Sequence, residues 1–255
     1  MGAGPLTAQL PAALRTRRDI VEGLDRWAAA SVRATADEAA VLVMASAAGG
    51  LLWAVGDVDQ LERLVPDVLV GHGPGLRWAT VPRAVRLPDD ALASAGIERR
   101  TSWDRFTTDA APATQPGQDT VVALDPVREA DAIGACLELA NPGTHARPGA
   151  AADETWWGVR DGDGVVGVLA AATRPGPTAP TVHLHGLGVV PAARGRGLGA
   201  ALAAAATRHA LSAGAPWVSL SMYADNVHAR RVYDALGFRV DVENVGYGPP
   251  GATRP

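Results

Sequence analysis

The second half of the chain alternates short apolar segments with segments that place an apolar residue every three or four positions. The first kind is typical of strands, and the second is typical of amphipathic helices. Strands are predicted at Thr120–Leu124, Thr155–Arg160, Val165–Thr173, Thr181–Val190, Trp217–Met222 and Phe238–Val242. Helices are predicted at Asp131–Ala140, Gly197–Ser212 and Asn226–Leu236. This order of elements predicts an α/β fold.

The first half has a weaker pattern of the same α/β type, without residues that indicate a chemistry. Helices are predicted at Asp19–Val32 and at Val58–Val65, where Pro66 is expected to stop the second one. Strands are predicted at Val41–Ala45, Leu51–Val55 and Arg77–Val85, the last ending near Pro82.

The segment between the two halves, Ala111–Gln118, is polar and proline-rich and has no apolar period. Such a composition is typical of a linker. We therefore expect an N-terminal α/β domain over residues 1–115, whose role its residues do not indicate, and a second domain over residues 119–249.

The composition narrows the classes of chemistry that the chain can perform. Hydrophobic residues make up 47% of the 255 residues, enough for a buried core, and the formal net charge of -4 argues against a general nucleic-acid groove. The chain contains no lysine, which excludes a lysine Schiff base and a Walker A phosphate loop. The single cysteine, Cys136, excludes an internal disulfide and a cysteine-rich zinc site.

Neither the N-terminus nor the most apolar stretch predicts a membrane segment. Met1–Arg18 lacks an apolar core of signal-peptide length. Ala39–Val55 is short for a membrane span and is interrupted by Gly49-Gly50. We therefore expect a soluble, cytoplasmic protein that has neither a membrane nor a nucleic acid as a partner.

A glycine- and arginine-rich turn joins the strand that ends at Pro191 to the alanine-rich helix after it. Over Leu187–Gly199 the sequence is LGVVPAARGRGLG. Free N–H groups at a helix N-terminus favour anions, and glycines let a phosphate approach the backbone. Arg194 and Arg196 add positive charge with forked donors. The turn is therefore predicted to bind a pyrophosphate.

The glycine spacing in this turn distinguishes two kinds of pyrophosphate site. It is G-x-G-x-G rather than the G-x-G-x-x-G of dinucleotide-binding folds. The order strand, proline, Arg194-x-x-Gly197-x-Gly199 and helix resembles the acyl-coenzyme A signature of the GNAT superfamily, the general-control-related N-acetyltransferases. This resemblance implies acetyl-CoA as the cosubstrate. The cofactor-binding residues that it implies are Leu187, Gly188, Val189, Arg194, Gly195, Arg196, Gly197, Leu198, Gly199, Ala200 and Asn226.

A second motif agrees with the same family. The sequence NVHARRVYDALGF over Asn226–Phe238 resembles the family's later helix and following strand, in which the asparagine lies near the pantetheine arm. The resemblance covers about Thr120–Tyr247, half the chain, and implies a mixed, mostly antiparallel central sheet flanked by helices. Residues 1–115 carry no such signature. Their α/β order suggests the hypothesis that they form a smaller, degenerate copy of the same fold.

Two histidines lie just before the glycine-rich turn. Because side chains alternate along a strand, His183 and His185 are expected on one face. Histidine titrates near neutral pH and suits removal of a proton from an amine, directly or through water. The segment HLHGLGV also resembles the HLHALAV strand of the arylalkylamine N-acetyltransferases, where paired histidines assist deprotonation. Most superfamily members carry glutamate near His185, so the chain departs from the family pattern here.

These observations assign roles to the candidate catalytic residues. His185, relayed by His183 or a water, is predicted to take the proton of the amine. The backbone N–H of Val189 is predicted to polarise the thioester carbonyl, and Tyr233 to protonate the leaving sulfur. Two other interpretations of the histidines stay open, namely hydrogen bonding to neighbours and a metal pair.

The sequence therefore predicts an N-acetyltransferase that moves an acetyl group from acetyl-CoA to a primary amine by direct transfer. The acceptor is expected to be a small-molecule or peptide amine, with the loop Asn141–Asp153 and Trp156 or Trp157 lining its pocket. Two alternatives stay open: a non-catalytic CoA-binding regulatory module, and a metal-dependent hydrolase built on His183 and His185. The prediction includes no metal, and it leaves open whether the chain is a monomer or a homodimer.

Overall fold

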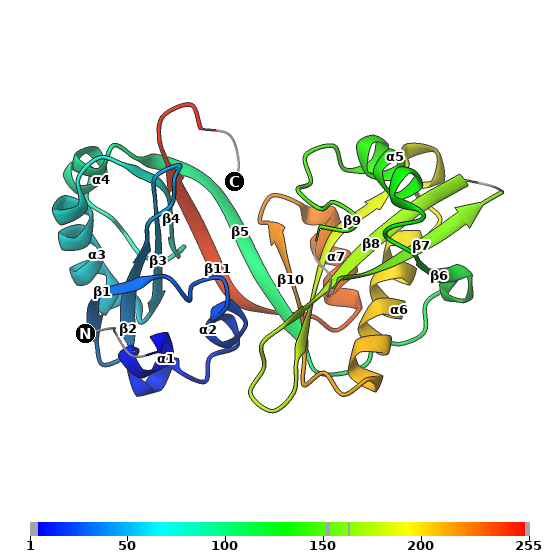
Figure 1. Cartoon of the computed structure of the whole chain (residues 1–255), viewed down its shortest axis with the longest axis horizontal. Coiled ribbons are helices and arrows are strands. Elements are labelled where there is room, and N and C mark those ends of the chain that lie inside the picture. The colour runs from blue at the N-terminus through cyan, green and yellow to red at the C-terminus, as the bar shows by residue number, and fades with distance from the viewer. Residues whose placement is uncertain (1–4, 151–153, 163, 253–255) are drawn as a thin grey trace. The chain divides into compact units, whose positions relative to one another are not determined.

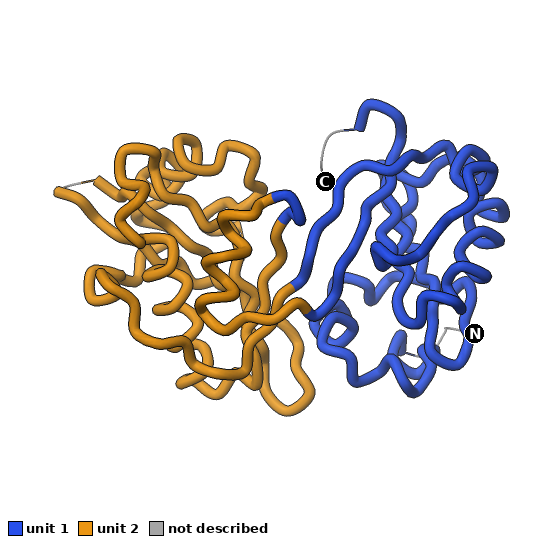
Figure 2. Tube along the Cα trace, turned by 180° about the vertical axis from the view of Figure 1, so that it is seen from behind, with its two compact units in different colours: residues 1–105, 223–225, 241–255 blue, residues 106–222, 226–240 orange. Residues whose placement is uncertain are grey.

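The structure of the chain is a computed structural model that describes residues 5–150, 154–162 and 164–252. Residues 1–4, at the start of the stretch analysed for a signal peptide, and residues 151–153, at the end of the predicted acceptor loop, lie outside this description. The chain forms two compact units (Figure 2). Unit 1 contains Met1–Arg105, Tyr223–Asp225 and Asp241–Pro255, and unit 2 contains Phe106–Met222 and Asn226–Val240. The division into domains near residue 115 stays a prediction.

Unit 1 is a sheet covered on both faces by helices. Its elements in chain order are α1 (Leu6–Gln9), η1 (Ala12–Leu14), α2 (Arg18–Gly23), β1 (Ser31–Ala36), β2 (Ala39–Met44), β3 (Gly50–Gly56), α3 (Val58–His72), β4 (Leu76–Pro82), α4 (Asp89–Ala95) and β5 (Glu98–Thr108). The strand order is β1-β2-β3-β4-β11-β5, where β11 (Arg239–Gly248) comes from the end of the chain. Pairs β1–β2, β2–β3 and β4–β11 are antiparallel, and β3–β4 is parallel.

Burial explains which faces the helices of unit 1 cover. Leu61, Val65 and Leu69 of α3 pack with the apolar side chains of β2 and β3 on one face. Leu6, Leu10, Leu14 and Ile20 of the N-terminal segment pack with Ala40 and Leu42 on the opposite face. The alternation of side chains along β2 therefore supplies two cores, one on each side.

Two predictions for unit 1 are wrong in their extent. The helix predicted at Asp19–Val32 ends at Gly23, and a turn follows that brings Trp27 onto Trp53, with ring centroids 5.2 Å apart. Val32 instead belongs to β1, because β-branched residues there favour pairing with β2.

The helix predicted to stop before Pro66 continues through that residue to His72. A proline removes a hydrogen bond from a helix, but Leu61, Val65 and Leu69 bury one continuous stripe across it. Tertiary packing therefore outweighs the local cost of the proline.

Unit 2 has the helices and strands that the sequence predicts between Thr120 and Leu236, together with two short 3-10 helices. They are η2 (Gln118–Thr120), β6 (Val121–Leu124), α5 (Ala130–Ala140), β7 (Glu154–Asp161), β8 (Gly164–Arg174), β9 (Thr181–Val189), η3 (Pro191–Ala193), α6 (Leu198–Ser212), β10 (Val218–Tyr223) and α7 (Val227–Ala235). The strands follow the order β10-β9-β8-β7-β6 (Figure 1). Only β9–β10 is parallel among the pairs with a defined register in this unit.

The sheet of unit 2 separates two apolar clusters. Leu169, Ala171 and Leu184 face the cluster around α6. Val168 and Ala170 face the cluster around α5, which includes Cys136 and Trp156. The mixed, mostly antiparallel sheet flanked by helices is therefore confirmed.

The chain contains the same order of elements twice. Three strands, a helix, a strand, a helix and a strand follow one another as β1-β2-β3-α3-β4-α4-β5 and as β7-β8-β9-α6-β10-α7-β11. In both series the strands before and after the long helix pair in parallel. This shared topology supports the hypothesis that residues 1–115 form a degenerate copy of the fold.

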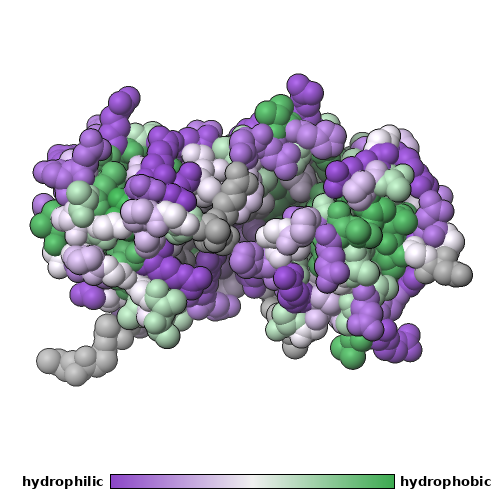
Figure 3. Space-filling model, turned by 90° about the horizontal axis from the view of Figure 1, so that it is seen from above, coloured by the Kyte–Doolittle hydropathy of each residue, from purple (hydrophilic) through white to green (hydrophobic). Residues whose placement is uncertain are grey.

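The surface shown in Figure 3 is predominantly polar. The large hydrophobic side chains exposed among the described residues are Val70, Val122, Val127, Leu139, Val227 and Val240. Within the described residues, no helix combines the length and the apolar character needed to span a bilayer.

Candidate functional site

The parallel strands β9 and β10 are paired over only part of their length. Their register ends at Leu184 opposite Leu220, whereas β9 continues to Val189. On the other edge of β9, the Val190 N–H donates to the Val166 carbonyl at 2.9 Å. Successive residues of a strand point their N–H groups to opposite edges. The N–H of Val189 therefore points to the edge where β10 no longer pairs.

A β-bulge lies in β9 directly after the histidines. Val168 pairs with Gly188 and Ala170 with His185, so Gly186 and Leu187 together face the single residue Leu169. Gly186 has φ +63°, and a Cβ there would lie 2.7 Å from the Cβ of Ala146. Only glycine fits this conformation and this contact. The bulge changes the direction of β9 between the histidines and Val189.

The predicted phosphate-binding turn has the expected backbone. Gly195 and Gly197 both have φ +77°, and Gly197 is the N-cap of α6. A Cβ on either glycine would meet nothing within 4 Å, so the space in front of the helix is open. The first turn of α6 has no side-chain cap and no acidic residue. The N–H groups of its first residues, Leu198, Gly199 and Ala200, have no partner within the helix.

The two arginines of the turn point to protein groups rather than into the open space. Arg194 donates to the carbonyl of Val189 at 3.1 Å and to that of Ala140 at 3.2 Å. It therefore ties the end of β9 to the end of α5. Arg196 pairs with Asp161 at 2.8 Å, and both side chains are more than half exposed. An exposed pair of this kind is weak, so Arg196 is available to an anionic ligand.

The two histidines lie side by side, as the strand alternation predicts. Their ring centroids are 6.4 Å apart and the rings are nearly parallel. His183 Nδ1 lies 2.8 Å from Oγ of Ser219, a buried residue of β10. Their partners on β8, Ala172 and Ala170, place both rings on the α5 face of the sheet.

Glu154 is a site residue that the sequence analysis missed. Its Oε1 lies 3.2 Å from Nε2 of His185, although the two atoms are not aligned as a hydrogen bond. Burial lowers the pKa of His185 below its ordinary 6.5, Glu154 partly opposes this, and Arg174 adds to it. The imidazole is therefore neutral near pH 7 and able to accept a proton. The alternation of side chains along the strand could have indicated this residue, because Glu154 and Trp156 are two positions apart and lie on the same face.

The two tryptophans of β7 lie on opposite faces. Trp156 is fully buried with Ala146 in the cluster under α5, on the histidine face. Trp157 packs on the α6 face, where its ring meets that of His209 at 5.0 Å. Trp156 rather than Trp157 therefore shares a face with the candidate base.

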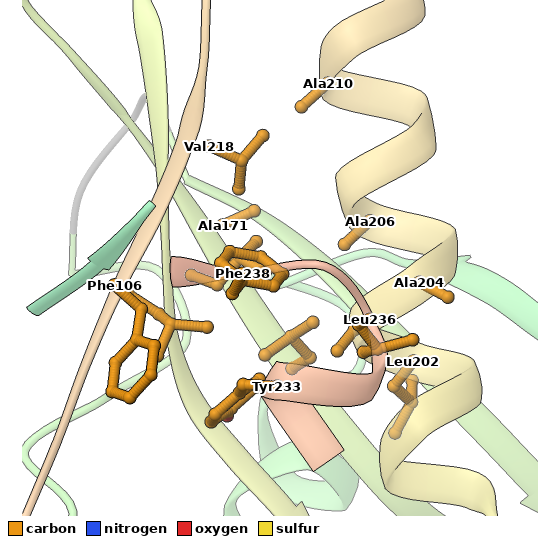
Figure 4. Packing of buried hydrophobic residues seen from close by; sticks show 14 of the residues in the cluster. Phe106, Ala171, Leu202, Ala204, Ala206, Ala210, Val218, Tyr233, Leu236 and Phe238 are labelled. Carbon is orange, nitrogen blue, oxygen red and sulfur yellow. The ribbon is translucent and has the colours of Figure 1, made fainter. Parts of the chain in front are cut away.

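Helix α7 holds the remaining predicted residues. Asn226 caps the helix, as predicted, by accepting from the Ala229 N–H at 3.0 Å. Tyr233 is buried in the cluster on the α6 face, between Phe106 and Phe238 (Figure 4). Burial raises the pKa of Tyr233 to about 12, so its hydroxyl stays protonated near pH 7.

The site residues thus form two groups. One is continuous along β9, the turn and the start of α6. The other is on α7, and its tyrosine lies on the face of the sheet opposite to the histidines. Among the described residues, no three histidine, cysteine, aspartate or glutamate side chains gather closely enough to hold a metal ion.

The parallel strands β9 and β10, which separate beside the glycine-lined N-terminus of α6, are consistent with the GNAT resemblance of the sequence. Residues 134–238 match the Acetyltransferase (GNAT) family. The match covers less than half of the chain and indicates a GNAT-type acetyltransferase domain over these residues.

Several curated relatives are named mycothiol acetyltransferase. The protein of Beutenbergia cavernae is 29% identical over 230 residues, which span 75% of this chain and 77% of the relative. That of Nocardiopsis dassonvillei is 44% identical over 71 residues, 28% of this chain and 22% of the relative. That of Parafrankia sp. is 38% identical over 105 residues, 41% of this chain and 33% of the relative. In these last two, the match spans no more than a third of the relative's length.

Two solved structures share the fold. A GCN5-related N-acetyltransferase from Kribbella flavida is 20% identical, with a TM-score of 0.58 and 98% of each chain covered. Another from Sphaerobacter thermophilus is 16% identical, with a TM-score of 0.56 over 98% of this chain and 96% of that one. Both matches extend over unit 1 as well as unit 2.

Proposed function

We propose that this chain transfers an acetyl group from acetyl-CoA directly to a primary amine of a small molecule. The observation that carries the proposal is the turn before α6. Two glycines at positive φ leave open space there, before a helix N-terminus that no side chain caps. Such a terminus favours a bound phosphate. It follows β9, the strand with both candidate bases.

The residues of the turn fit the diphosphate of coenzyme A. The N–H groups of Leu198, Gly199 and Ala200 would donate to it, and Arg196 would exchange Asp161 for a phosphate oxygen. Acetyl-CoA, when bound, supplies the acetyl group as a reactive thioester. The N–H of Val189, on the unpaired edge of β9, is the donor that we assign to the thioester carbonyl.

His185 is the base in this proposal. An ammonium ion has no free lone pair, so the acceptor must lose a proton before it attacks. His185 is neutral because burial lowers its pKa, and its side chain keeps 25% of its surface exposed. It is therefore able to accept a proton, and part of its side chain is exposed.

Tyr233 is the acid in this proposal. The departing thiolate needs a proton, and burial keeps the Tyr233 hydroxyl protonated well above neutral pH. Asn226, two turns earlier, fixes the start of the same helix. The motif that contains both residues favours this role over a purely structural one.

The names of the relatives supply the first acceptor to test. They are mycothiol acetyltransferases, so we propose the amine that mycothiol carries when its acetyl group is missing. Trp156 and Ala146 are buried on the histidine face, and in this proposal they form the floor beneath the acceptor.

A panel of amines with acetyl-CoA tests the proposal. The panel holds mycothiol without its acetyl group, arylalkylamines, polyamines, amino acids and peptides, and mass spectrometry detects acetylated products. We expect turnover of at least one small-molecule amine, together with CoA binding by calorimetry. Binding without turnover of any amine would instead indicate a regulatory CoA-binding module, and absence of binding would overturn the proposal.

A further inference from the structure

Two buried polar atoms, one on Glu154 and one on the candidate base His185, lack an aligned hydrogen bond. Within the described part of the chain, neither Oε2 of Glu154 nor Nε2 of His185 has a hydrogen bond. The Glu154 side chain is only 10% exposed. A buried carboxylate oxygen without a donor is costly, so this arrangement favours a ligand that brings donors.

The sheet is built to bring the two side chains together. Glu154 on β7 and His183 on β9 both pair with Ala172 of the intervening strand, and His185 pairs with Ala170. The side chains of these alanines end at the methyl group, so they do not separate the longer side chains of β7 and β9. A glutamate on one strand thereby reaches an imidazole two strands away.

The charges around His185 determine what kind of ligand the pair of side chains attracts. Glu154 from β7 is the nearest charge, and Arg174 at the end of β8 opposes it. His183 stacks from the same strand. Cys136 on α5 faces the same cluster as a neutral thiol, because burial raises its pKa to about 11. One carboxylate next to a neutral base is an arrangement that attracts a cation able to donate protons.

We propose that Glu154 and His185 together bind the acceptor as its ammonium ion and then deprotonate it. This inference rests on the proposed function and specifies the substrate class as cationic primary amines. One N–H of the ammonium donates to Oε2 of Glu154, and a second proton passes to Nε2 of His185. The amine keeps the N–H electron pair as its lone pair, and the new imidazolium is paired with the Glu154 carboxylate.

Histidine NMR tests the pair without requiring any activity. The ring signals of His185 are identified by their loss in His185→Asn, and their pKa is measured in the wild type and in Glu154→Gln. Because the carboxylate raises the pKa of His185, its removal should lower that pKa further. An unchanged or higher pKa in Glu154→Gln would contradict the pairing.

Steady-state kinetics test the ammonium site. Glu154→Gln should raise the KM of the amine by roughly tenfold, equal to about 1.4 kcal/mol, while the Kd of CoA stays unchanged. Glu154→Asp should restore most of the amine binding. Glu138→Gln, on the exposed surface of α5, is the matched control and should behave as the wild type. Equal amine KM values in wild type and Glu154→Gln would overturn the proposal.

A third measurement uses the wild-type protein and so does not depend on how variants fold. For an amine that turns over, the trimethylammonium analogue should inhibit more strongly than its uncharged tert-butyl isostere. Equal inhibition would count against a cation site. If no amine turns over, the proposed function fails, whereas the NMR titration still decides whether Glu154 controls His185.

Discussion

At the scale of single residues, Tyr233 combines burial with a retained proton. Burial raises its pKa from 10.0 to about 12, so the hydroxyl remains an acid throughout the pH range of an assay. Tyr233→Phe keeps the ring packed between Phe106 and Phe238 and removes only the proton donor. We expect kcat to fall about a hundredfold, with little change in the free energy of unfolding.

The matching control for Tyr233→Phe is the pH profile. In the wild type, loss of activity through ionisation of Tyr233 should begin only as the pH rises through 10 toward about 12. Because the pKa of Tyr233 is raised in the folded state, the stability that the protonated hydroxyl contributes is complete below pH 10. It is lost as the pH rises from 10 to about 12. Unchanged kcat in Tyr233→Phe would contradict the acid role.

Strand alternation alone predicts that His183 and His185 lie side by side, and the stacked rings confirm it. Alternation cannot predict their partners. The approach of Glu154 to His185 depends on how β7, β8 and β9 pair, and the bulge at Gly186 shifts that register. Ser219 reaches His183 from β10 in the same way. Partners brought together by long-range pairing leave no local pattern in the sequence.

At the scale of elements, two glycines at the N-terminus of α6 can be compared by substituting each with alanine. Gly197 has φ +77°, which an alanine adopts only under strain of about 1 kcal/mol. Gly199 has no such φ, and a Cβ there meets Leu187 at an ordinary 3.9 Å. Gly199→Ala should therefore stabilise the helix by up to about 1 kcal/mol.

Binding of CoA should separate the same two variants. Gly197→Ala distorts the turn that exposes the N–H groups, so the Kd of CoA should rise by roughly tenfold or more, equal to about 1.4 kcal/mol. Gly199→Ala keeps its N–H and its backbone conformation, so the Kd of CoA should rise less than in Gly197→Ala. Calorimetry with CoA measures both, and equal Kd values for the two variants would contradict the assigned role of the turn.

The cap of α7 supports a separate stability prediction. Asn226 accepts from the Ala229 N–H, so Asn226→Ala should lower the free energy of unfolding by about 1 kcal/mol. Asn226→Asp keeps an acceptor and serves as the control. Urea unfolding measures both variants, and equal losses would show that the side chain acts in some way other than as a cap.

Helices with a clear capping residue at their start could be predicted from the sequence. Helices α6 and α7 begin at the glycine and asparagine that predict their starts. The elements of unit 1 were harder to predict, because their apolar residues pack into two cores, one on each face of the sheet. Ile20 and Trp27 are both buried in one core, yet a turn rather than a helix brings the second one there. The pattern of apolar residues shows which side chains are buried, but a buried side chain can belong to a helix or to a turn.

At the scale of the whole molecule, the end of the chain completes a sheet that its beginning starts. Arg105 of β5 pairs with Glu22 of α2 and Asp241 of β11, and Glu22 is almost fully buried. Arg105→Met would remove a buried cation that pairs with both carboxylates. We expect a loss of about 3 kcal/mol in the free energy of unfolding.

The matched control for Arg105→Met is Arg128→Met. Arg128 also pairs with a carboxylate, that of Asp125, but its side chain is 84% exposed. Its removal should change stability by no more than about 0.5 kcal/mol. Comparable losses in the two variants, measured by urea unfolding, would contradict the importance of burial.

The repeated topology raises the question of whether each unit binds a coenzyme. In unit 1, the equivalent of the glycine-rich turn is the connection from β3 to α3. Asp57 caps α3 by accepting from the Gln60 N–H at 3.0 Å, and Asp59 adds a second carboxylate in the first turn. A Cβ on Gly56 would lie 1.9 Å from a backbone oxygen. This helix start is thus closed, negatively charged and already capped.

We therefore expect one molecule of CoA per chain. A carboxylate repels a phosphate where the open N-terminus of α6 attracts it. Calorimetry should give a stoichiometry of one for the wild type, and Gly197→Glu should abolish the binding heat while circular dichroism shows an intact fold. Two equivalents in the wild type, or one remaining in Gly197→Glu, would mean that unit 1 binds CoA by a route that avoids Asp57. A single site would mean that the repeated order of elements does not carry coenzyme binding with it. Asp57 at the start of α3, in place of an open glycine turn, would then restrict binding to unit 2.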